Sequence, residues 1–557
     1  MSRTGGRILV DQLALHGADL AFGVPGESYI DVLDALRDSP IRYVTCRHEA
    51  GAANMAEAYG KLTGRPGICM VTRGPGATQA SVGVHTAFQD GTPLLLLVGQ
   101  IRRSDAEREA FQEIDYRRML GPLAKWVAEI DRAERVPELV ARAFRTATSG
   151  RPGPVVLALP EDMLAERADA PDASPYAPAQ AGPTSGDLAR ARELLAGAER
   201  PLAVVGGLPW STAAGAALAA WCAASGVPVA AAWRCQDYVD NEAACYAGHL
   251  GLGADAALRD RLRDADVLLV VGARLGDIET GGFTTIVPPG LGRVLIHVHP
   301  DPDELGRVYE PALPIVSSGA AFAEALTELE PLDGTGRATA LERAHAEYRA
   351  TLAARELPGE LDLTRVMAIL RERLPDDAIL ASGAGNFTVW AHRFYVFRRY
   401  GTQLAPISGA MGYGLPAAIA AKLVDPDRTV VCLAGDGDLL MSAGELATAR
   451  QAGADVVVLA VDNGMYGTIR MHQERRFPGR VSGTDLENPD FAALARSFGW
   501  EAEQVERTED VPAALDRALG AGAPALLHLR VDPEALTPRQ TLSEIRAEAE
   551  ARGAPPS

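Results

Sequence analysis

The chain has 557 residues, enough for about three to five domain-sized units. Apolar residues make up 47% of it, which indicates large buried cores rather than disorder. Its 54 basic and 73 acidic residues give a formal charge of −19. This charge argues against a nucleic acid as partner, because binding to a phosphate backbone depends on clustered Lys and Arg.

The six cysteines are scattered and form no CxxC pair, so we expect neither a disulfide scaffold nor a structural zinc site. The first residues lack the apolar stretch of a signal peptide. No apolar run approaches the ~20 residues that span a bilayer. We therefore expect a soluble cytoplasmic protein without a membrane partner.

Two stretches interrupt an otherwise regular alternation of apolar runs. Residues 166–186 are rich in Ala, Pro and Ser, and residues 331–360 are charged, with a surface helix expected in much of the second stretch. The predicted domains are 1–165, 187–330 and 361–535. Residues 536–557 are charged and then rich in Ala and Pro, which predicts a mobile tail.

Each predicted domain alternates short β-branched runs with helical stretches rich in Ala and Leu. In chain order the predicted strands are 68–72, 94–99, 155–159, 202–206, 267–272, 294–299, 378–381, 429–434, 456–461 and 525–531. Continuous apolar strands separated by helices indicate parallel sheets covered on both faces. We therefore expect an α/β fold of three doubly wound parallel-sheet domains, with ligands beyond the carboxyl ends of the strands.

In the first domain, Glu49 precedes an apolar stretch, 50–59, that predicts a buried helix. A glutamate at a helix N-terminus is favourable on dipole grounds alone, so its position does not by itself indicate catalysis. Gly-rich turns occur at 22–26 and 72–78, and they are of the kind that follows strands.

The strongest motif is in the third domain, where a predicted strand ends in Gly435, Asp436, Gly437 and Asp438. Asn463 follows Asp436 by 27 residues, at the end of the next predicted strand. One right-handed crossover joins the two strands, so both side chains should present oxygens to the same crevice. A hard cation such as Mg²⁺ prefers such oxygens together with phosphate oxygens and water.

This spacing resembles the motif of thiamine diphosphate-dependent enzymes, and the order of the three domains resembles acetolactate synthase large subunits. The resemblance implies that Asp436, Asn463 and the backbone carbonyl of Met465 bind Mg²⁺. It also implies that Glu49 exchanges a proton with the aminopyrimidine ring of the cofactor and so activates its reactive carbon. Burial of a carboxyl group favours the protonated form that such an exchange needs.

The resemblance assigns further residues to the cofactor and the substrate. Met411 would support the bend of the cofactor, and the carbonyl of Gly409 would accept from its amino group. Gln112 and His472 would lie on the substrate side. The remaining cofactor-binding residues that it implies are Pro25, Gly26, Thr72, Pro75, Gln79, Gly385, Asn386, Phe387, Gly435, Gly437, Asp438, Tyr466, Gly467 and Thr468.

Several residues depart from the family pattern. Asp462 stands in place of the first Asn of the motif, and Gln79 replaces an Asn. His472 replaces a Trp, and Glu161 replaces a Lys near the substrate channel, so we expect an altered acceptor specificity. Gly-rich turns of the central domain, such as 206–207 and 272–277, occur where related proteins contact FAD. Such turns also serve simply to build an α/β domain, so FAD, an ADP-like nucleotide and no nucleotide all stay open.

The resemblance implies an enzyme that decarboxylates a 2-oxo acid and transfers the acyl group to a carbonyl acceptor. A 2-oxo acid decarboxylase or C–C lyase is the alternative within the family, and a non-catalytic cofactor-binding protein is the alternative outside it. One cofactor must touch residues of both outer domains. In this family those residues come from two subunits, so we expect a homodimer or homotetramer with active sites at the subunit interface.

Overall fold

The computed structural model describes residues 2–289 and 292–553, which form two compact units. The first unit contains Met1–Ala179, Pro406–Pro426 and Ser442–Ala454. The second contains Gln180–Ala405, Asp427–Met441 and Asp455–Ser557. Two segments that the sequence places in the third domain therefore belong to the first unit, while the domain boundaries themselves stay a prediction.

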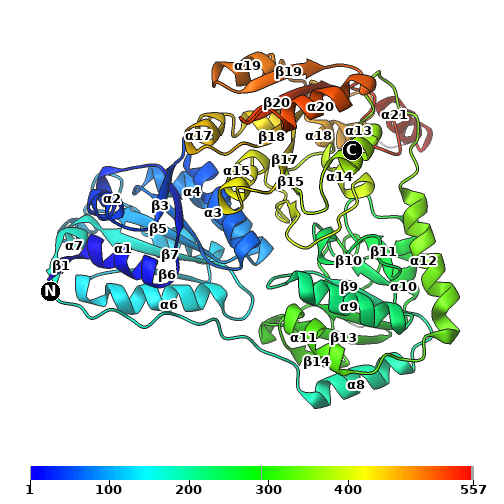
Figure 1. Cartoon of the computed structure of the whole chain (residues 1–557), viewed down its shortest axis with the longest axis horizontal. Helices are drawn as coiled ribbons and strands as arrows, with labels where there is room; N and C mark the ends of the chain where they lie inside the picture. Colours follow the sequence, from blue (N-terminus) through cyan, green and yellow to red (C-terminus); the bar gives the residue numbers. More distant parts are fainter. Residues whose placement is uncertain (1, 290–291, 554–557) are drawn as a thin grey trace. The chain divides into compact units, whose positions relative to one another are not determined.

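A six-stranded parallel sheet organises the first unit, with the strand order β3-β2-β4-β5-β7-β6 (Figure 1). Its strands are β2 (Leu20–Gly23), β3 (Arg42–Thr45), β4 (Gly67–Val71), β5 (Leu94–Gln100), β6 (Trp126–Glu129) and β7 (Pro154–Pro160). The short strands β1 (Arg3–Thr4) and β8 (Arg167–Ala168) pair separately and antiparallel. The helices are α1 (Gly5–Leu15), α2 (Ile30–Arg37), α3 (Glu49–Thr63), α4 (Pro75–Asp90), α5 (Tyr116–Leu120), α6 (Val136–Thr148), α7 (Glu161–Ala165), α15 (Gly414–Val424) and α17 (Glu445–Ala452).

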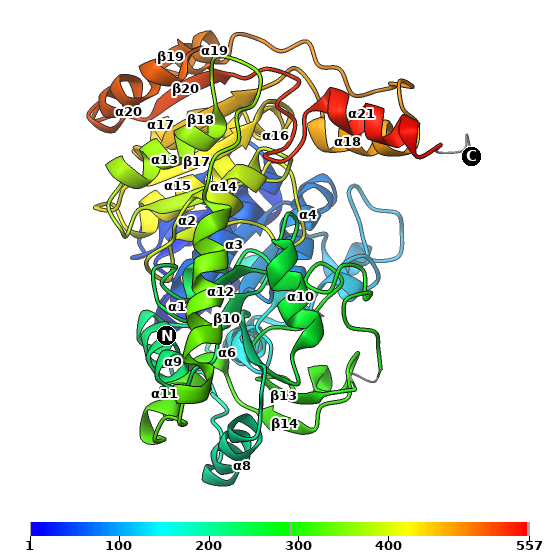
Figure 2. The same ribbon diagram turned by 90° about the vertical axis from the view of Figure 1, so that its right-hand side faces the viewer.

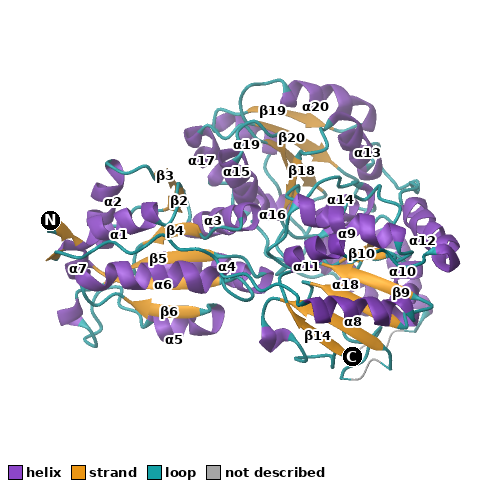
Figure 3. Ribbon diagram, turned by 60° about the horizontal axis from the view of Figure 1, so that its bottom comes forward, coloured by secondary structure: helices purple, strands orange, loops and turns teal. Residues whose placement is uncertain are grey.

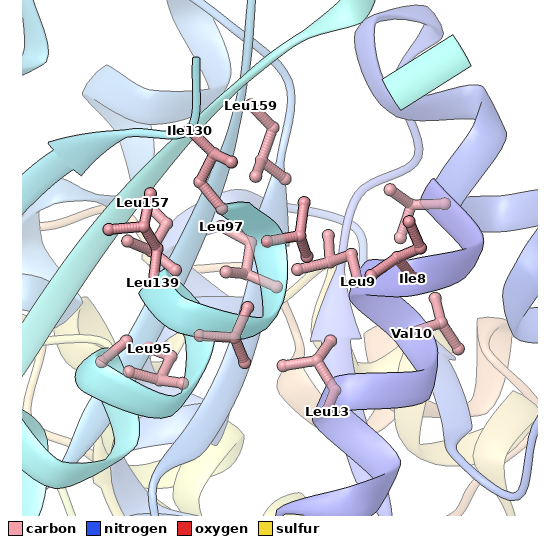
Figure 4. Packing of buried hydrophobic residues seen from close by; sticks show 14 of the residues in the cluster. Ile8, Leu9, Val10, Leu13, Leu95, Leu97, Ile130, Leu139, Leu157 and Leu159 are labelled. Atoms are coloured by element: carbon pink, nitrogen blue, oxygen red, sulfur yellow. The ribbon is translucent and has the colours of Figure 1, made fainter. Parts of the chain in front are cut away.

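The core of this unit forms because each central strand is an unbroken apolar run. Figure 4 shows Leu9 of α1 and Leu139 of α6 packed with Leu97 and Leu157 of the sheet. Helices α3 and α4 pack against each other and against β4 and β5, outside that cluster. Both faces of the sheet are thus covered, as continuous apolar strands require.

The second unit contains two more six-stranded parallel sheets (Figure 3). The central sheet has the order β11-β10-β9-β12-β13-β14, with β9 (Pro201–Val205), β10 (Val229–Ala231), β11 (Tyr246–His249), β12 (Val267–Val271), β13 (Val294–His299) and β14 (Leu313–Val316). The last sheet has the order β16-β15-β17-β18-β20-β19, with β15 (Ile379–Ser382), β16 (Gln403–Leu404), β17 (Val430–Gly435), β18 (Val457–Asp462), β19 (Glu501–Val505) and β20 (Ala525–Arg530). The helices are α8 (Ser185–Ala196), α9 (Thr212–Ala224), α10 (Ala256–Asp264), α11 (Gly319–Ala325), α12 (Ala338–Thr351), α13 (Leu363–Arg373), α14 (Thr388–Phe394), α16 (Asp436–Leu440), α18 (Gly467–Arg476), α19 (Phe491–Ser497), α20 (Val511–Leu519) and α21 (Leu542–Ala551).

The first and last sheets share one topology. Numbered within each sheet in chain order, the strands of both run 2-1-3-4-6-5. The direction of strand succession reverses between strands 1 and 3, which are β2 and β4 in the first sheet and β15 and β17 in the last. Ligands of open α/β sheets bind at such a reversal, beyond the carboxyl ends of the strands. The three parallel sheets confirm the predicted fold class.

The expected mobile tail is wrong for its described part. Helix α21 lies beside α18 (Figure 2), and Leu542 and Ile545 are buried with Met471 and Leu536. A capping box at Thr541 starts the helix, and apolar residues one turn apart give it a face to bury. Residues 554–557 of the predicted tail lie outside the described residues. The surface helix expected within 331–360 is α12.

Candidate functional site

One group of predicted residues lies at the strand reversal of the first sheet. Gly26 packs against Thr72 so closely that a Cβ on Gly26 would lie 2.5 Å from Thr72 Cβ. The hydroxyl groups of Ser28 and Thr72 are 2.9 Å apart and share a hydrogen bond. A Cβ on Gly76 would lie 3.4 Å from Glu49 Oε1. The ends of β2 and β4 and the start of α3 therefore converge.

Glu49 is the first residue of α3, and its exposed fraction is 9%. The residue before it caps the helix, because His48 Nδ1 accepts from the backbone N–H of Ala50 at 3.1 Å. The predicted helix over 50–59 is confirmed, and Glu49 is at its amino end as expected.

A second buried glutamate, Glu445 of α17, fixes the turn in front of Glu49. Its Oε1 accepts from the backbone N–H groups of His48 at 2.9 Å and Arg47 at 3.2 Å. Burial raises the pKa of Glu445. A Cβ on Gly51 would lie 2.5 Å from that same oxygen, so the close approach requires glycine. Glu445 was not predicted from the sequence, because its partners lie almost 400 residues away and no local motif marks it.

The segment that carries Gly409 and Met411 is also held by buried carboxylates of the first unit. Asp90 accepts from the backbone N–H groups of Ile407 at 3.0 Å and Ser408 at 3.2 Å. Met411 is half-buried, and Gly409 is exposed with a φ of 71°, which favours glycine. The turn before α15 is thus fixed in place at its start.

Glu57 fixes the other end of that turn, since Tyr413 Oη donates to its Oε2 at 2.5 Å. Lys61 pairs with Asp90 at 2.5 Å and with Glu57 at 3.3 Å. Although burial opposes it, the two carboxylates raise the pKa of Lys61. This network, like Glu445, was not predicted from the sequence.

Arg73 pairs with Glu161, which departs from the family pattern, and with a second acidic residue, Glu27. Its guanidinium lies 3.0 Å from Glu161 and 3.5 Å from Glu27, and its Nε donates to the carbonyl of Phe111 at 3.4 Å. Gln112 follows with a φ of 67°, and its Cβ would lie 2.8 Å from a Cβ on Gly74. The negative charge expected near the substrate channel is therefore paired with arginine.

The remaining residues predicted for the first unit are more exposed. Pro75 is the first residue of α4, and Gln79 follows one turn later on its exposed side. Pro25 lies in the loop after β2, next to the Gly26 contact with Thr72. These positions agree with the predicted turns, and the carbonyl of Pro75 accepts from the hydroxyl of Thr78 at 2.8 Å.

The second group of predicted residues lies at the strand reversal of the last sheet. Asp436 Oδ1 accepts from the N–H of Gly437 at 2.8 Å, and its Oδ2 accepts from the N–H of Gly464 at 2.9 Å. Burial and the nearby charge of Asp462 raise the pKa of Asp436 to about 6. Asn463 follows β18, and its Oδ1 accepts from the N–H of Met465 at 3.2 Å. The two predicted oxygen donors therefore stand at the ends of neighbouring strands.

Glycines let the turns at this edge come close to aromatic and acidic side chains. A Cβ on Gly435 or on Gly385 would lie 2.7 Å from the ring of Phe387. A Cβ on Gly437 would lie 2.5 Å from the ring of Tyr466. Asp438 is buried and accepts from the N–H of Ala384 at 3.3 Å.

Helix α18 joins this group through Thr468, whose hydroxyl donates to Asn386 Oδ1 at 2.9 Å. Gly467 starts the helix, and a Cβ there would lie 3.2 Å from Asn463 Nδ2. His472 is exposed on the same helix. The structure thus gathers the predicted residues into two groups, one in each compact unit.

Asp462, which departs from the family motif, has partners that suit a carboxylate. Its Oδ2 lies 2.9 Å from His528 Nε2, and its Oδ1 accepts from Asn488 Nδ2 at 2.8 Å. Although burial opposes it, these two bonds lower the pKa of Asp462 to about 2. Asn488 Nδ2 also donates to Asp436 at 2.9 Å, while its Oδ1 is buried without a hydrogen-bond partner in the described residues.

The donor chemistry of this edge fits a hard cation and a diphosphate. A carboxylate and an amide oxygen are ligands that Mg²⁺ prefers, and it takes its other ligands from phosphate and water. No group of three or more His, Cys, Asp or Glu side chains within 2–289 and 292–553 could hold a metal ion alone. A cation here would therefore depend on phosphate oxygens as well.

Family comparisons divide the chain in the same way as its three sheets. The N-terminal TPP binding domain of thiamine pyrophosphate enzymes matches residues 3–119, the central domain matches 188–326, and the C-terminal TPP binding domain matches 383–529. Over 95% of its length the chain is 31% identical to the acetolactate synthase isozyme 2 large subunit of Escherichia coli, of which 95% is covered. It is 32% identical to the acetolactate synthase large subunit of Parasynechococcus marenigrum, with 95% and 87% covered.

The chain belongs to the thiamine pyrophosphate enzyme family. It is an enzyme that binds thiamine diphosphate, the other name of thiamine pyrophosphate, which sets aside the alternative of a non-catalytic protein. Glu49, Thr72 and Gln112 fall within the N-terminal TPP binding domain, and Asp436 and Asn463 fall within the C-terminal one.

The Gly-rich turns of the central domain have a packing explanation. Gly207 follows β9 and Gly272 follows β12, at the strand reversal of the central sheet. A Cβ on Gly207 would lie 2.1 Å from the carbonyl oxygen of Gly272, and one on Gly272 would lie 2.2 Å from that of Gly206. The two turns pack backbone to backbone, so their glycines do not by themselves indicate a nucleotide.

The cysteine and membrane expectations can also be compared with the structure. All six cysteines are free and buried. Within the described part of the chain, no helix combines the length and the hydropathy needed to cross a membrane.

Proposed function

We propose that this enzyme uses thiamine diphosphate and Mg²⁺ to decarboxylate a 2-oxo acid and transfer its acyl group to a carbonyl acceptor. One observation carries the proposal: two sheets of the same strand order each have an acidic site at the same reversal. Glu49 stands beside the reversal of one sheet, and Asp436 stands at that of the other, with Asn463 at the end of the neighbouring strand. The names of the relatives, acetolactate synthase large subunits, support a carboligase.

The diphosphate end of the cofactor would be held at the last sheet. Asp436, Asn463 and the carbonyl of Met465 would bind Mg²⁺, and the glycine turns at 383–385 and 435–437 would let phosphate oxygens approach the backbone. The side chains of Asn386 and Thr468 would line the same edge, where they already bond to each other. When bound, thiamine diphosphate supplies the electron sink for decarboxylation.

The pyrimidine end would be held at the first sheet. Glu49 would hold a proton at the ring nitrogen, a task that its buried place at the start of α3 suits. Met411 would support the bend of the cofactor, and Gly409 would accept from its amino group. Gln112 and His472 would position the substrate.

Decarboxylation or C–C cleavage with a proton as acceptor is the second candidate. It is supported by Glu161, which stands where the family has a lysine and which pairs with Arg73, as Glu27 does. The charge that would attract an acidic acceptor is therefore reduced, which favours a neutral acceptor or a proton.

We also propose that the active enzyme is a homodimer or homotetramer with its sites at the subunit interface, because one cofactor would need both groups of residues. A cytoplasmic location belongs to this proposal and is supported by the six free cysteines. FAD and an ADP-like nucleotide remain the alternatives to an empty central domain. The visible absorption spectrum of the purified protein tests for the flavin.

Product analysis tests the proposed reaction. The purified enzyme with Mg²⁺ and thiamine diphosphate is incubated with a panel of 2-oxo acids, each alone and with an added aldehyde. A carboligase gives a 2-hydroxy ketone or 2-aceto-2-hydroxy acid, whereas a decarboxylase gives the free aldehyde. If the enzyme binds the cofactor but consumes none of the 2-oxo acids, the proposal is contradicted.

A further inference from the structure

A cleft in the second unit contains buried polar groups that the proposed reaction does not use. Its walls come from the end of β11, the start of α10, the last turns of α12 and α14, and Arg539. Figure 2 shows α10 and α12, which both belong to the second unit. The cavity has a volume of about 30 Å³, which exceeds the space that one water molecule needs.

Three residues that line this cleft have side-chain polar atoms with no hydrogen-bond partner in the part of the chain that the structure describes. They are both ring nitrogens of His392, His249 Nδ1 and Tyr348 Oη. His392 is 3% exposed and Tyr348 is 8% exposed. Buried polar atoms in folded proteins are paired as a rule, so such a group of orphans points to a ligand or to water.

The charged residues of the cleft distinguish between a bound ligand and water. Arg539 lies 3.8 Å from Asp255, but no salt bridge to Arg393 occurs within 2–289 and 292–553. Burial and the charge of Arg539 lower the pKa of Arg393, although the charge of Asp255 opposes this shift. Arg261 and Glu347 also line the cleft, and they pair with each other at 2.7 Å. Among the described residues, Arg393 is therefore the arginine of the cleft that has no carboxylate partner, and a bound anion would supply one.

The protonation states of the other groups also suit an anion. Burial, with Arg393 and Arg539 nearby, lowers the pKa of His249 to about 4, and burial lowers the pKa of His392. Burial raises the pKa of Tyr348. Near neutral pH the histidines are therefore uncharged, and each can offer one N–H, while the phenol offers its O–H.

We propose that this cleft binds a tetrahedral oxyanion, either free phosphate or sulfate or the phosphate group of a larger metabolite. Arg393 and Arg539 would supply the charge, and Tyr348, His249 and His392 would supply neutral donors. The site is separate from the residues proposed to hold the diphosphate of the cofactor, so it would serve an effector or a second ligand.

Isothermal titration of the holoenzyme with sulfate tests the proposal. Saturating thiamine diphosphate and Mg²⁺ keep the cofactor site filled, and sulfate avoids precipitation with Mg²⁺. We expect saturable binding of one sulfate per chain, weakened at least about 10-fold by Arg393→Gln. The matched control is Arg517→Gln on α20, an exposed arginine paired with Glu503, which should bind sulfate as the wild type does.

Tyr348→Phe keeps the test independent of misfolding. It removes only a hydroxyl that has no hydrogen-bond partner among the described residues, so the fold should be unchanged while sulfate binding weakens about 3- to 10-fold. ADP titrated in a parallel arm separates the sources: binding of ADP that the same variants weaken assigns the oxyanion to a nucleotide. No saturable sulfate binding in the millimolar range, or binding that neither variant changes, would overturn the proposal.

Discussion

At the scale of single residues, Asp436, the proposed metal ligand, differs from an ordinary surface carboxylate. It is 5% exposed, and both of its oxygens accept backbone N–H groups at the ends of neighbouring strands. These bonds fix the direction in which the free lone pairs point. A substitution here should therefore remove a preorganised ligand rather than a flexible charge.

We expect Asp436→Ala to abolish Mg²⁺-dependent retention of thiamine diphosphate, because the diphosphate needs the metal as a bridge to the protein. Equilibrium dialysis with labelled cofactor, with and without Mg²⁺, measures the effect. Asp455→Ala provides the control, since Asp455 is exposed just before β18. Wild-type cofactor affinity in Asp436→Ala would refute the assignment of this metal ligand.

His392 gives a second residue-scale prediction, on the pH dependence of stability. The unfolded chain binds a proton on this ring near pH 6.5, whereas the folded chain, in which burial lowers the pKa of His392, does not. Its contribution to the free energy of unfolding is thus complete above that pH. It is lost, by about 1.4 kcal/mol per pH unit, as the pH falls below it.

The comparison of His392→Phe with the wild type isolates this contribution. Urea unfolding at pH 7 and at pH 5, in buffer without sulfate or phosphate, should give a smaller loss of stability in the variant. His472→Phe, at an exposed position, should behave as the wild type does. An identical loss in all three proteins would show that His392 is protonated in the folded chain.

At the scale of elements, α21 shows that composition is a weak guide to the end of the chain. Its residues are charged, yet Arg546 pairs with Glu474 of α18 through two bonds of 2.7 and 2.9 Å. Glu474 has no exposed side-chain surface. The partner that orders the helix is 72 residues away, so the sequence around 542–551 alone gives no sign of it.

We expect Arg546→Ala to lower the free energy of unfolding by about 1–3 kcal/mol, because it leaves the buried Glu474 carboxylate unpaired. Because 37% of the side-chain surface of Arg546 is accessible, water screens this ion pair. The loss of stability should therefore be smaller than for a fully buried ion pair. Arg552→Ala, which breaks the exposed pair with Glu548, should change stability by less than about 1 kcal/mol. Equal effects in both variants, measured by urea unfolding, would contradict the docking role of Glu474.

The strands and turns could be predicted from the sequence, but the contacts between distant segments could not. The unbroken apolar runs around Leu95 and Val458 predicted their strands, and the glycines after Ala434 predicted the motif, because these signals are local. Glu445, Asn488 and His528 were missed, because each acts through a partner that only the fold brings near. Burial of a polar residue beside a distant chain segment has no periodicity to detect.

At the scale of the whole molecule, the shared strand order of the outer sheets suggests a division of labour. In the proposed reaction, the first sheet would supply the carboxylate for the pyrimidine ring, and the last sheet would supply the oxygens for the metal and diphosphate. If the active site forms between two chains, each chain contributes one half to each of two sites. This arrangement predicts complementation between inactive variants.

We expect a mixture of Glu49→Gln and Asp436→Ala chains to regain activity after unfolding and refolding together. In a randomly mixed dimer population, half of the dimers are mixed and each has one intact site of two, which gives about a quarter of wild-type activity. Sedimentation at the assay concentration should show a dimer or tetramer. Each variant refolded alone is the control, and no gain in the mixture would place both halves of the site in one chain.

The most direct test of the account is the exchange of the reactive C2 proton of bound thiamine diphosphate in deuterated buffer, in wild type and in Glu49→Gln. The amide is nearly isosteric, so cofactor affinity should survive, but it cannot hold or move a proton at the ring nitrogen. We predict exchange slower by about 10²–10⁴-fold, the usual effect of a positioned general acid–base. Exchange at the wild-type rate, with cofactor bound, would make Glu49 a structural residue and contradict the account.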